Sequence, residues 1–160
     1  MHQRLFVLAA LLVAPGALQG AGDATLDRGT LRGLKAISVV VDLIDPQLEQ
    51  EGLTKDYLEK ERASRLLNGG IVINKQAVEF VGLKVTEIRE KKAPYSLYLS
   101  LGLYQPVILS RDKNIRTATQ TWETGTILTA QPKVLMQSAR SAADYLADKY
   151  IDAWRSVNPQ

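Results

Sequence analysis

Hydrophobic side chains recur at every second position in several stretches of the chain, the period of a β-strand with one buried face. The clearest case spans residues 95–104, where the apolar positions are Leu97, Leu99, Leu101 and Leu103. Successive side chains of a strand point to opposite faces, so we expect these leucines to enter the core. The outward-facing row between them is Tyr98, Ser100, Gly102 and Tyr104.

Weaker patterns predict the other strands. Residues 35–43 alternate with apolar positions at Ile37, Val39, Val41 and Leu43, before Asp45 and Pro46 break the run. A short strand is expected at 71–73, and a strand with a bulge or bend at Gly82 over 77–89. Residues 107–109 continue the leucine strand, and the β-branched residues of 117–127 predict a strand that pairs antiparallel with it.

Two helices are expected. Thr54 is a capping residue for a helix over 54–67, which ends at the glycines Gly69 and Gly70. A longer helix starts at Pro132 and ends before Asn158. Its apolar face recurs at steps of three and four residues: Leu135, Ala139, Ala142, Leu146, Tyr150, Ala153 and Val157.

The order of elements is strand, helix, several strands, helix. Two amphipathic helices and a one-sided sheet combine most simply as a two-layer sandwich. We therefore predict an α+β fold with a mostly antiparallel sheet of about four to five strands packed by two helices. No internal repeat or linker interrupts residues 23–160, which predicts one domain there.

Residues 1–22 have the features of a cleavable signal peptide. A basic Arg4 precedes ten apolar residues, and Pro15 and Gly16 lead into small residues. The apolar run is shorter than the roughly 20 residues needed to cross a bilayer, and no basic stop follows it, which disfavours an uncleaved anchor. We expect cleavage between Gly20 and Ala24, hence a periplasmic or secreted protein with no membrane span in its mature part.

Composition narrows the possible chemistry. The only histidine is His2, within the expected signal peptide, and the chain has no cysteine. Catalytic arrangements that depend on His or Cys are thereby excluded from the mature chain, as are the zinc sites built from them. Lys and Arg number 20 against 17 Asp and Glu, a balance that argues against a nucleic-acid partner. We expect no cofactor and no metal.

The remaining candidates for chemistry are carboxylates and aromatic residues. Asp42 with Asp45 and Glu59 with Glu61 form pairs, without the spacing of an EF-hand calcium loop. Glu123 adjoins Trp122 at a strand end, which allows two interpretations. Trp122 is either a core residue or a stacking platform that binds a ligand beside the carboxylate.

Two surface features suggest recognition. The row that contains Tyr98 and Tyr104 is either an interaction surface, since tyrosine combines contact area with a polar group, or is covered by another element. Residues 111–116 are rich in positive charge, and they form either a solvated hairpin turn or a contact for an anionic surface.

Three segments resemble those of small exported bacterial α/β proteins of uncharacterised function. They are residues 45–71, which begin with Asp45 and Pro46, contain EGLT and close on Gly70 and Ile71; residues 121–125, TWETG; and residues 154–159, WRSVNP. Residues 77–92 depart from the compact loop expected there. The resemblance implies the fold and export, and it carries no activity or catalytic residue.

The leading hypothesis is an exported, non-catalytic interaction module, an accessory subunit of a bacterial cell-envelope assembly. It would bind a protein partner or a second copy of itself through the tyrosine row or an exposed sheet edge. The alternative is a small-ligand binding protein or a carboxylate-dependent hydrolase acting on envelope polymers, with Glu123 and Trp122 at its site.

Overall fold

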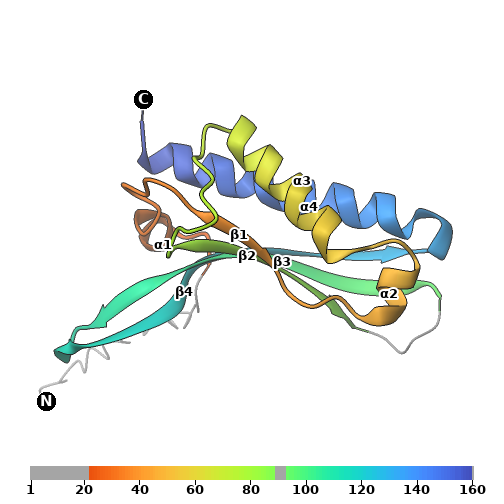
Figure 1. Ribbon diagram of the computed structural model, residues 1–160, viewed down its shortest axis with the longest axis horizontal. Coiled ribbons are helices and arrows are strands. Elements are labelled where there is room, and N and C mark those ends of the chain that lie inside the picture. The colour runs from red at the N-terminus through yellow and green to blue at the C-terminus, as the bar shows by residue number, and fades with distance from the viewer. Residues whose placement is uncertain (1–21, 89–92, 160) are drawn as a thin grey trace, which may run out of the picture.

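A four-stranded sheet carries helices on one face in this computed structural model, which describes residues 22–88 and 93–159 (Figure 1). The strands are β1 (Ser38–Val41), β2 (Phe80–Glu87), β3 (Tyr95–Leu109) and β4 (Asp112–Ala130). They lie in the order β1-β2-β3-β4. The predicted two-layer α+β fold is confirmed.

The pairing directions follow from the connections. β2 and β3, and β3 and β4, pair antiparallel. β1 and β2 pair parallel, because α2 (Pro46–Gln50) and α3 (Lys55–Asn68) lie between them in the chain and carry it back to the starting end of the sheet. The sheet is therefore mixed, with two of its three pairings antiparallel as expected.

Two expectations about strands were wrong in detail. Residues 71–73 form no strand and contribute one bridge, between Ile73 and Ile37. β2 pairs with β3 without a register shift from Phe80 to Glu87, so Gly82 causes no bulge. The glycine has a different role, which the ring of Tyr104 reveals below.

β3 and β4 are longer than the sequence suggested. β3 runs through Pro106, which lies opposite Ala118, and the two strands stay paired as far as Ile108 and Arg116. β2 reaches only Tyr104, so beyond that residue the sheet narrows to a two-stranded ribbon. This projection, residues 105–119, is called the arm below, and it extends away from the helices in Figure 1.

The helix boundaries show why local sequence predicted them well. α4 spans Pro132–Val157, as expected. α3 starts after Thr54, whose hydroxyl accepts a hydrogen bond from the backbone N–H of Tyr57 at 3.4 Å. Two short helices were not expected, α1 (Thr25–Gly29) and α2. Asp45 does more than break a strand, because its side chain caps α2 by accepting from the Gln47 backbone N–H at 2.8 Å.

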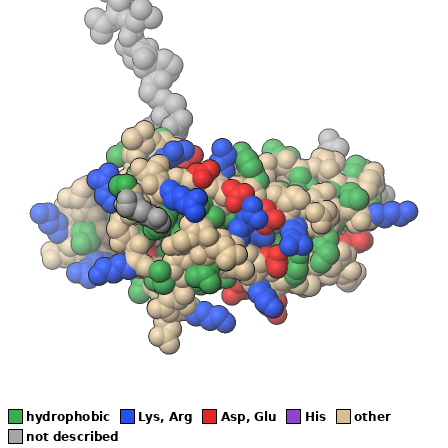
Figure 2. All heavy atoms as spheres, turned by 90° about the horizontal axis from the view of Figure 1, so that it is seen from above, with side chains coloured by type: hydrophobic (Ala, Val, Ile, Leu, Met, Phe, Trp, Pro, Cys, Tyr) green, Lys and Arg blue, Asp and Glu red, His purple; other side chains and the backbone are tan. Residues whose placement is uncertain are grey.

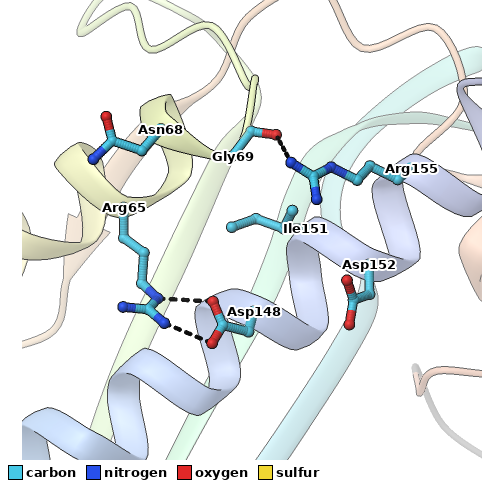
Figure 3. Close-up of a pocket in the computed structure, with 7 residues that line it drawn as sticks. All are labelled: Arg65, Asn68, Gly69, Asp148, Ile151, Asp152 and Arg155. Atoms are coloured by element: carbon cyan, nitrogen blue, oxygen red, sulfur yellow. Dashed lines mark hydrogen bonds and ion pairs between the residues drawn. The ribbon is translucent and has the colours of Figure 1, made fainter. Parts of the chain in front are cut away.

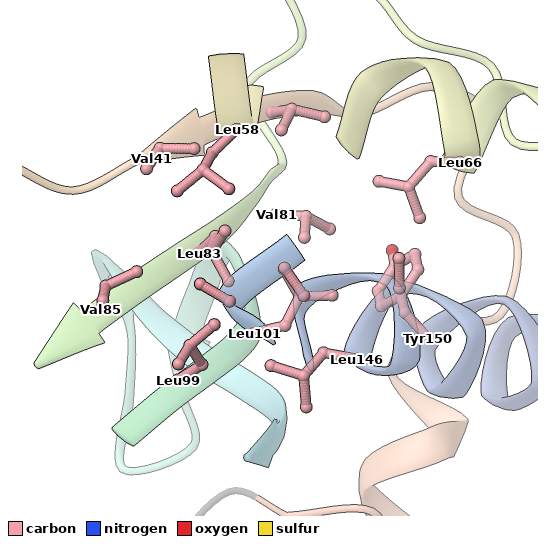
Figure 4. Packing of buried hydrophobic residues seen from close by; sticks show 14 of the residues in the cluster. Val41, Leu58, Leu66, Val81, Leu83, Val85, Leu99, Leu101, Leu146 and Tyr150 are labelled. Atoms are coloured by element: carbon pink, nitrogen blue, oxygen red, sulfur yellow. The ribbon is translucent and has the colours of Figure 1, made fainter. Parts of the chain in front are cut away.

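The leucine row of β3 lies at the centre of one core cluster, where α3 and α4 pack on the sheet (Figure 4). Leu97, Leu99, Leu101 and Leu103 are all fully buried. Leu146 and Tyr150 of α4 lie opposite them, while Leu43 is 88% exposed because β1 ends at Val41. On α4 the buried face is broader than the predicted stripe and includes Ala143, Ala147 and Ile151, whereas Ala142 is only half-buried.

The expected signal peptide, apart from its last residue, lies outside the described residues, as does part of the expected hairpin tip at 87–94. None of the described helices has the length and apolar character needed to cross a membrane.

Candidate interaction surface

The face of the sheet opposite the helices carries no helix (Figure 1). Tyr98 and Tyr104 lie on this open face, as the alternation predicted, and both are half-buried. Register places Phe80 and Gly82 of β2, Gly102 of β3 and Gly125 and Ile127 of β4 on the same face. The face thus combines aromatic rings with glycines.

An aromatic stack forms one end of the open face. The rings of Phe80 and Tyr104 lie parallel, with centroids 4.9 Å apart and 6° between their planes. The Tyr104 ring also covers Gly82, where an added Cβ would lie 3.0 Å from the ring. A side chain at Gly82 would therefore displace the ring, so the glycine keeps the tyrosine flat on the sheet.

Tyr98 forms the second aromatic position, and it lies flat across Gly125 of the neighbouring strand. An added Cβ at Gly125 would lie 2.8 Å from its ring, closer than such contacts occur. Gly102 is covered in the same way by the side chain of Gln120. The open face is consequently shallow and nearly flat, a shape suited to a large partner rather than an enclosed small ligand.

The hydroxyl of Tyr104 stays protonated over the physiological range. Burial raises the pKa of this phenol, and the negative charges of Asp42 and Glu123 raise it further. A protonated phenol donates as well as accepts hydrogen bonds. The stack thus presents a polar group that a partner's backbone carbonyl can accept from.

Trp122 is a core residue, and it has no exposed surface on which a ligand could stack. Its ring meets Tyr150 edge-on at 5.2 Å, and its indole N–H donates to the Asp23 carboxylate at 2.9 Å. The interpretation of Trp122 as core is confirmed. Glu123 faces the other way, half-buried on the open face, and lines none of the hollows found among the described residues.

Asp23 fastens the start of the described chain to this core tryptophan. Its carboxylate also accepts two hydrogen bonds from Arg28, at 2.7 and 2.6 Å. The hydrogen bonds from Arg28 lower the pKa of Asp23, and that from Trp122 lowers it further, against the effect of burial. Hydrogen bonds from Arg65 lower the pKa of Asp148 in the same way.

These two carboxylates predict a loss of stability in acid. Their pKa values are lower in the folded than in the unfolded chain, so the unfolded chain binds protons first as pH falls. The stabilisation is complete above about pH 4, the ordinary range for Asp, and is lost as pH falls through the folded values. Urea unfolding at a series of pH values should show this fall. The Asp23→Asn/Asp148→Asn variant should show a shallower one, and an equal slope in both proteins would contradict the assignment.

The outer edge of β4 is free along most of its length on the core of the sheet. The backbone N–H of Glu123 donates to the Gly22 carbonyl at 3.2 Å, which shows that Glu123 points away from β3. Gly125, Ile127 and Thr129 follow at the same period and point the same way. No backbone hydrogen bond between described residues reaches these three groups on that side.

The residues of this free edge lack the usual protection of an edge strand. Residues 124–130 contain no charged residue and no proline, the two devices that most often prevent pairing with another chain. Ile127 is 68% exposed beside the half-buried Tyr98, its partner across the strands. The free edge and the open face thus form one continuous surface.

A hollow of about 500 Å³ lies between the end of α3 and α4 (Figure 3). Its charged groups are engaged with each other. The Arg65 guanidinium binds both oxygens of Asp148, at 2.8 and 2.6 Å, and Arg155 donates to the Gly69 carbonyl at 2.9 Å. Groups that hold one another in this way are typical of a charged helix interface, and they leave little capacity for proton transfer to a substrate.

The carboxylates that the sequence singled out are separated in the same manner. Asp45 caps α2, and Glu61 pairs with Arg140 at 2.9 Å. Among residues 22–88 and 93–159 there is no group of three or more side chains suited to holding a metal ion. Sequence reasoning found Tyr98 and Tyr104, but it missed Phe80 and the free edge at Ile127, because strand order decides which strand lies outermost.

No family model matches this sequence, and no curated protein matches it. Two solved structures are similar in part. One is a PelC dodecamer from Paraburkholderia phytofirmans, 18% identical, covering 81% of this chain and 92% of that one, with a TM-score of 0.44. The other is a minor lipoprotein from Acinetobacter baumannii, 12% identical, covering 78% and 93%, with a TM-score of 0.35. At these values neither likeness assigns a function or an assembly to this chain.

Proposed function

We propose that this protein is an exported, non-catalytic interaction module that binds an extended segment of a protein partner along the free edge of β4. The observation that carries the proposal is the unprotected edge formed by Gly125, Ile127 and Thr129. The partner belongs to a bacterial cell-envelope assembly of the periplasm or cell surface, and a second copy of the chain is a special case of the same pairing.

The chemistry of strand addition fits this edge. Main-chain hydrogen bonds supply affinity without regard to sequence, and pockets for alternate side chains supply specificity. The outward N–H and C=O groups of the edge would make the hydrogen bonds. Ile127 and Tyr98, with the Phe80–Tyr104 stack further along, would contact the side chains that the added strand turns toward the open face.

Export is supported by residues 1–22, whose basic, apolar and small-residue parts match a signal peptide. The lack of cysteine and of any histidine after His2 supports a binding role over a catalytic one. The arrangement of the described carboxylates agrees, since each pair singled out in the sequence is divided between a helix cap and an ion pair.

The test places a charge on the edge. Ile127→Lys should abolish binding, because lysine on an edge strand opposes pairing. The matched control is Val78→Lys, which changes a side chain of the same 68% exposure in a loop before β2. Each tagged protein would be used to capture its partner from the envelope fraction of its own organism, and sedimentation equilibrium would report pairing with a second copy.

The mode of binding needs a separate measurement. Amide hydrogen exchange should slow at Gly125, Ile127 and Thr129 when the captured partner, or the second copy, is bound. Tyr98→Ser/Tyr104→Ser should weaken the complex while leaving the thermal midpoint within a few degrees, since both rings lie on the open face. A complex that survives Ile127→Lys, or one that leaves those three amides unprotected, would refute the proposal.

A further inference from the structure

The arm, residues 105–119, is the part of the described chain with the fewest supports of its own. Beyond Tyr104 it has two strands and no third, and an isolated two-stranded hairpin is marginally stable in water. Asp112 shapes its tip by accepting from the Asn114 backbone N–H at 2.9 Å. A ribbon of this kind that projects into solvent gains stability when it contacts another surface.

The charges of the arm tip differ from those on the rest of the molecule. Arg111, Lys113 and Arg116 are exposed, against one acidic residue, Asp112. Within the described chain none of the three basic side chains makes an ion pair. By contrast, the basic residues of the helices with ion pairs to nearby carboxylates are Arg28, Arg62, Arg65 and Arg140.

The space-filling view shows the same contrast (Figure 2). Positive and negative side chains alternate over the helices, whereas the left-hand end of the molecule, where the arm lies, shows positive side chains without negative neighbours. An unpaired positive tip attracts an anionic surface over about a Debye length. The electrostatics thus select the sign of the partner.

Apolar side chains adjoin these charges. Ile108 is 55% exposed and lies opposite Arg116 across the two strands, and Ile115, beside Arg116 in sequence, is 42% exposed. Exposed isoleucines are costly in water and gain free energy on transfer to an apolar medium. Basic and large aliphatic groups side by side are typical of elements that lie at the boundary of lipid headgroups and acyl chains.

We propose that the arm binds the surface of a bilayer that contains anionic lipids, with Arg111, Lys113 and Arg116 on the headgroup phosphates and Ile108 and Ile115 at the acyl boundary. The basic residues alone would also suit a nucleic acid, but a phosphate backbone offers nothing to the isoleucines. This site lies at the opposite end of β4 from the free edge at Gly125–Thr129, so the protein holds a membrane surface and a protein partner at separate places.

The test measures binding of the purified full chain to vesicles of phosphatidylcholine mixed with phosphatidylglycerol, and to vesicles of phosphatidylcholine alone. Arg111→Gln/Lys113→Gln/Arg116→Gln should weaken binding to the anionic vesicles by about 100-fold, since each basic residue near such a surface contributes roughly fivefold. Lys60→Gln/Lys75→Gln/Lys133→Gln removes the same charge from exposed positions elsewhere, and it should change binding by less than about threefold.

The apolar part of the site has its own readout. The chain has no cysteine, so Ile108→Cys and Val78→Cys each give one position for an environment-sensitive fluorophore. Emission from position 108 should shift to the blue on anionic vesicles, and emission from position 78 should not. This separates insertion into lipid from loose attraction to charge.

Three results would overturn the proposal: equal binding to both kinds of vesicle, an equal loss in the two triple variants, or a DNA duplex that competes fully with the vesicles. The proposal is also distinct from strand addition at the free edge. Ile127→Lys should leave vesicle binding unchanged, and the arm triple variant should leave capture of the protein partner unchanged.

Discussion

Asp144→Ala should lower the free energy of unfolding by about 3–5 kcal/mol, the usual cost of leaving a buried charge without its partner. Arg62 of α3 is 1% exposed, and Asp144 of α4 is the carboxylate that pairs with it. For a chain of this size the change corresponds to a fall of roughly 10 °C in thermal midpoint. Urea unfolding of the two proteins, followed by circular dichroism, measures it.

Two further variants separate charge from packing. Arg62→Met/Asp144→Ala should recover most of the lost stability, because an apolar side chain of similar length needs no counter-charge. Asp148→Ala removes the partner of Arg65, whose side chain is 40% exposed, and it should cost less than about 1 kcal/mol. An equal loss in Asp144→Ala and Asp148→Ala would show that Arg62 is solvated when unpaired.

Trp122→Ala should cost a similar amount, about 3–5 kcal/mol, because it empties the largest fully buried side chain of the core. Trp122→Phe keeps an aromatic ring near Tyr150 and loses the hydrogen bond to Asp23. Its cost should be smaller, about 2 kcal/mol, the contribution of a hydrogen bond to a charged group.

Urea unfolding gives both values, and an unchanged dependence on urea concentration would show that the variants unfold from the same compact state. A loss below about 1 kcal/mol for Trp122→Ala would mean that the residue is not part of the core. The same pair of variants decides between the two interpretations of the TWETG segment, since a ligand platform would tolerate alanine without loss of stability.

The accuracy of prediction followed the range of the interactions involved. Thr54 and Pro132 determine where α3 and α4 begin through contacts within a few residues, and both starts were predicted to within one residue. The leucine row of β3 entered the core as expected, because backbone geometry alone sends alternate side chains to opposite faces. The helix over 46–50 was missed because Asp45 and Pro46 favour a turn and a helix start alike.

The sequence by itself determined the strand and helix periodicities, the inward leucines, the outward tyrosines and the lack of imidazole and thiol chemistry in the proposed mature chain, since each depends on local residue identity. Tertiary structure alone decided that β1 lies parallel to β2, that β4 is the outer strand with a free edge, and that its other end forms the arm. It also decided the burial of Arg62 and Trp122. These features depend on which distant segments pack together, and the local period of a strand is the same whether its neighbour is another strand or solvent.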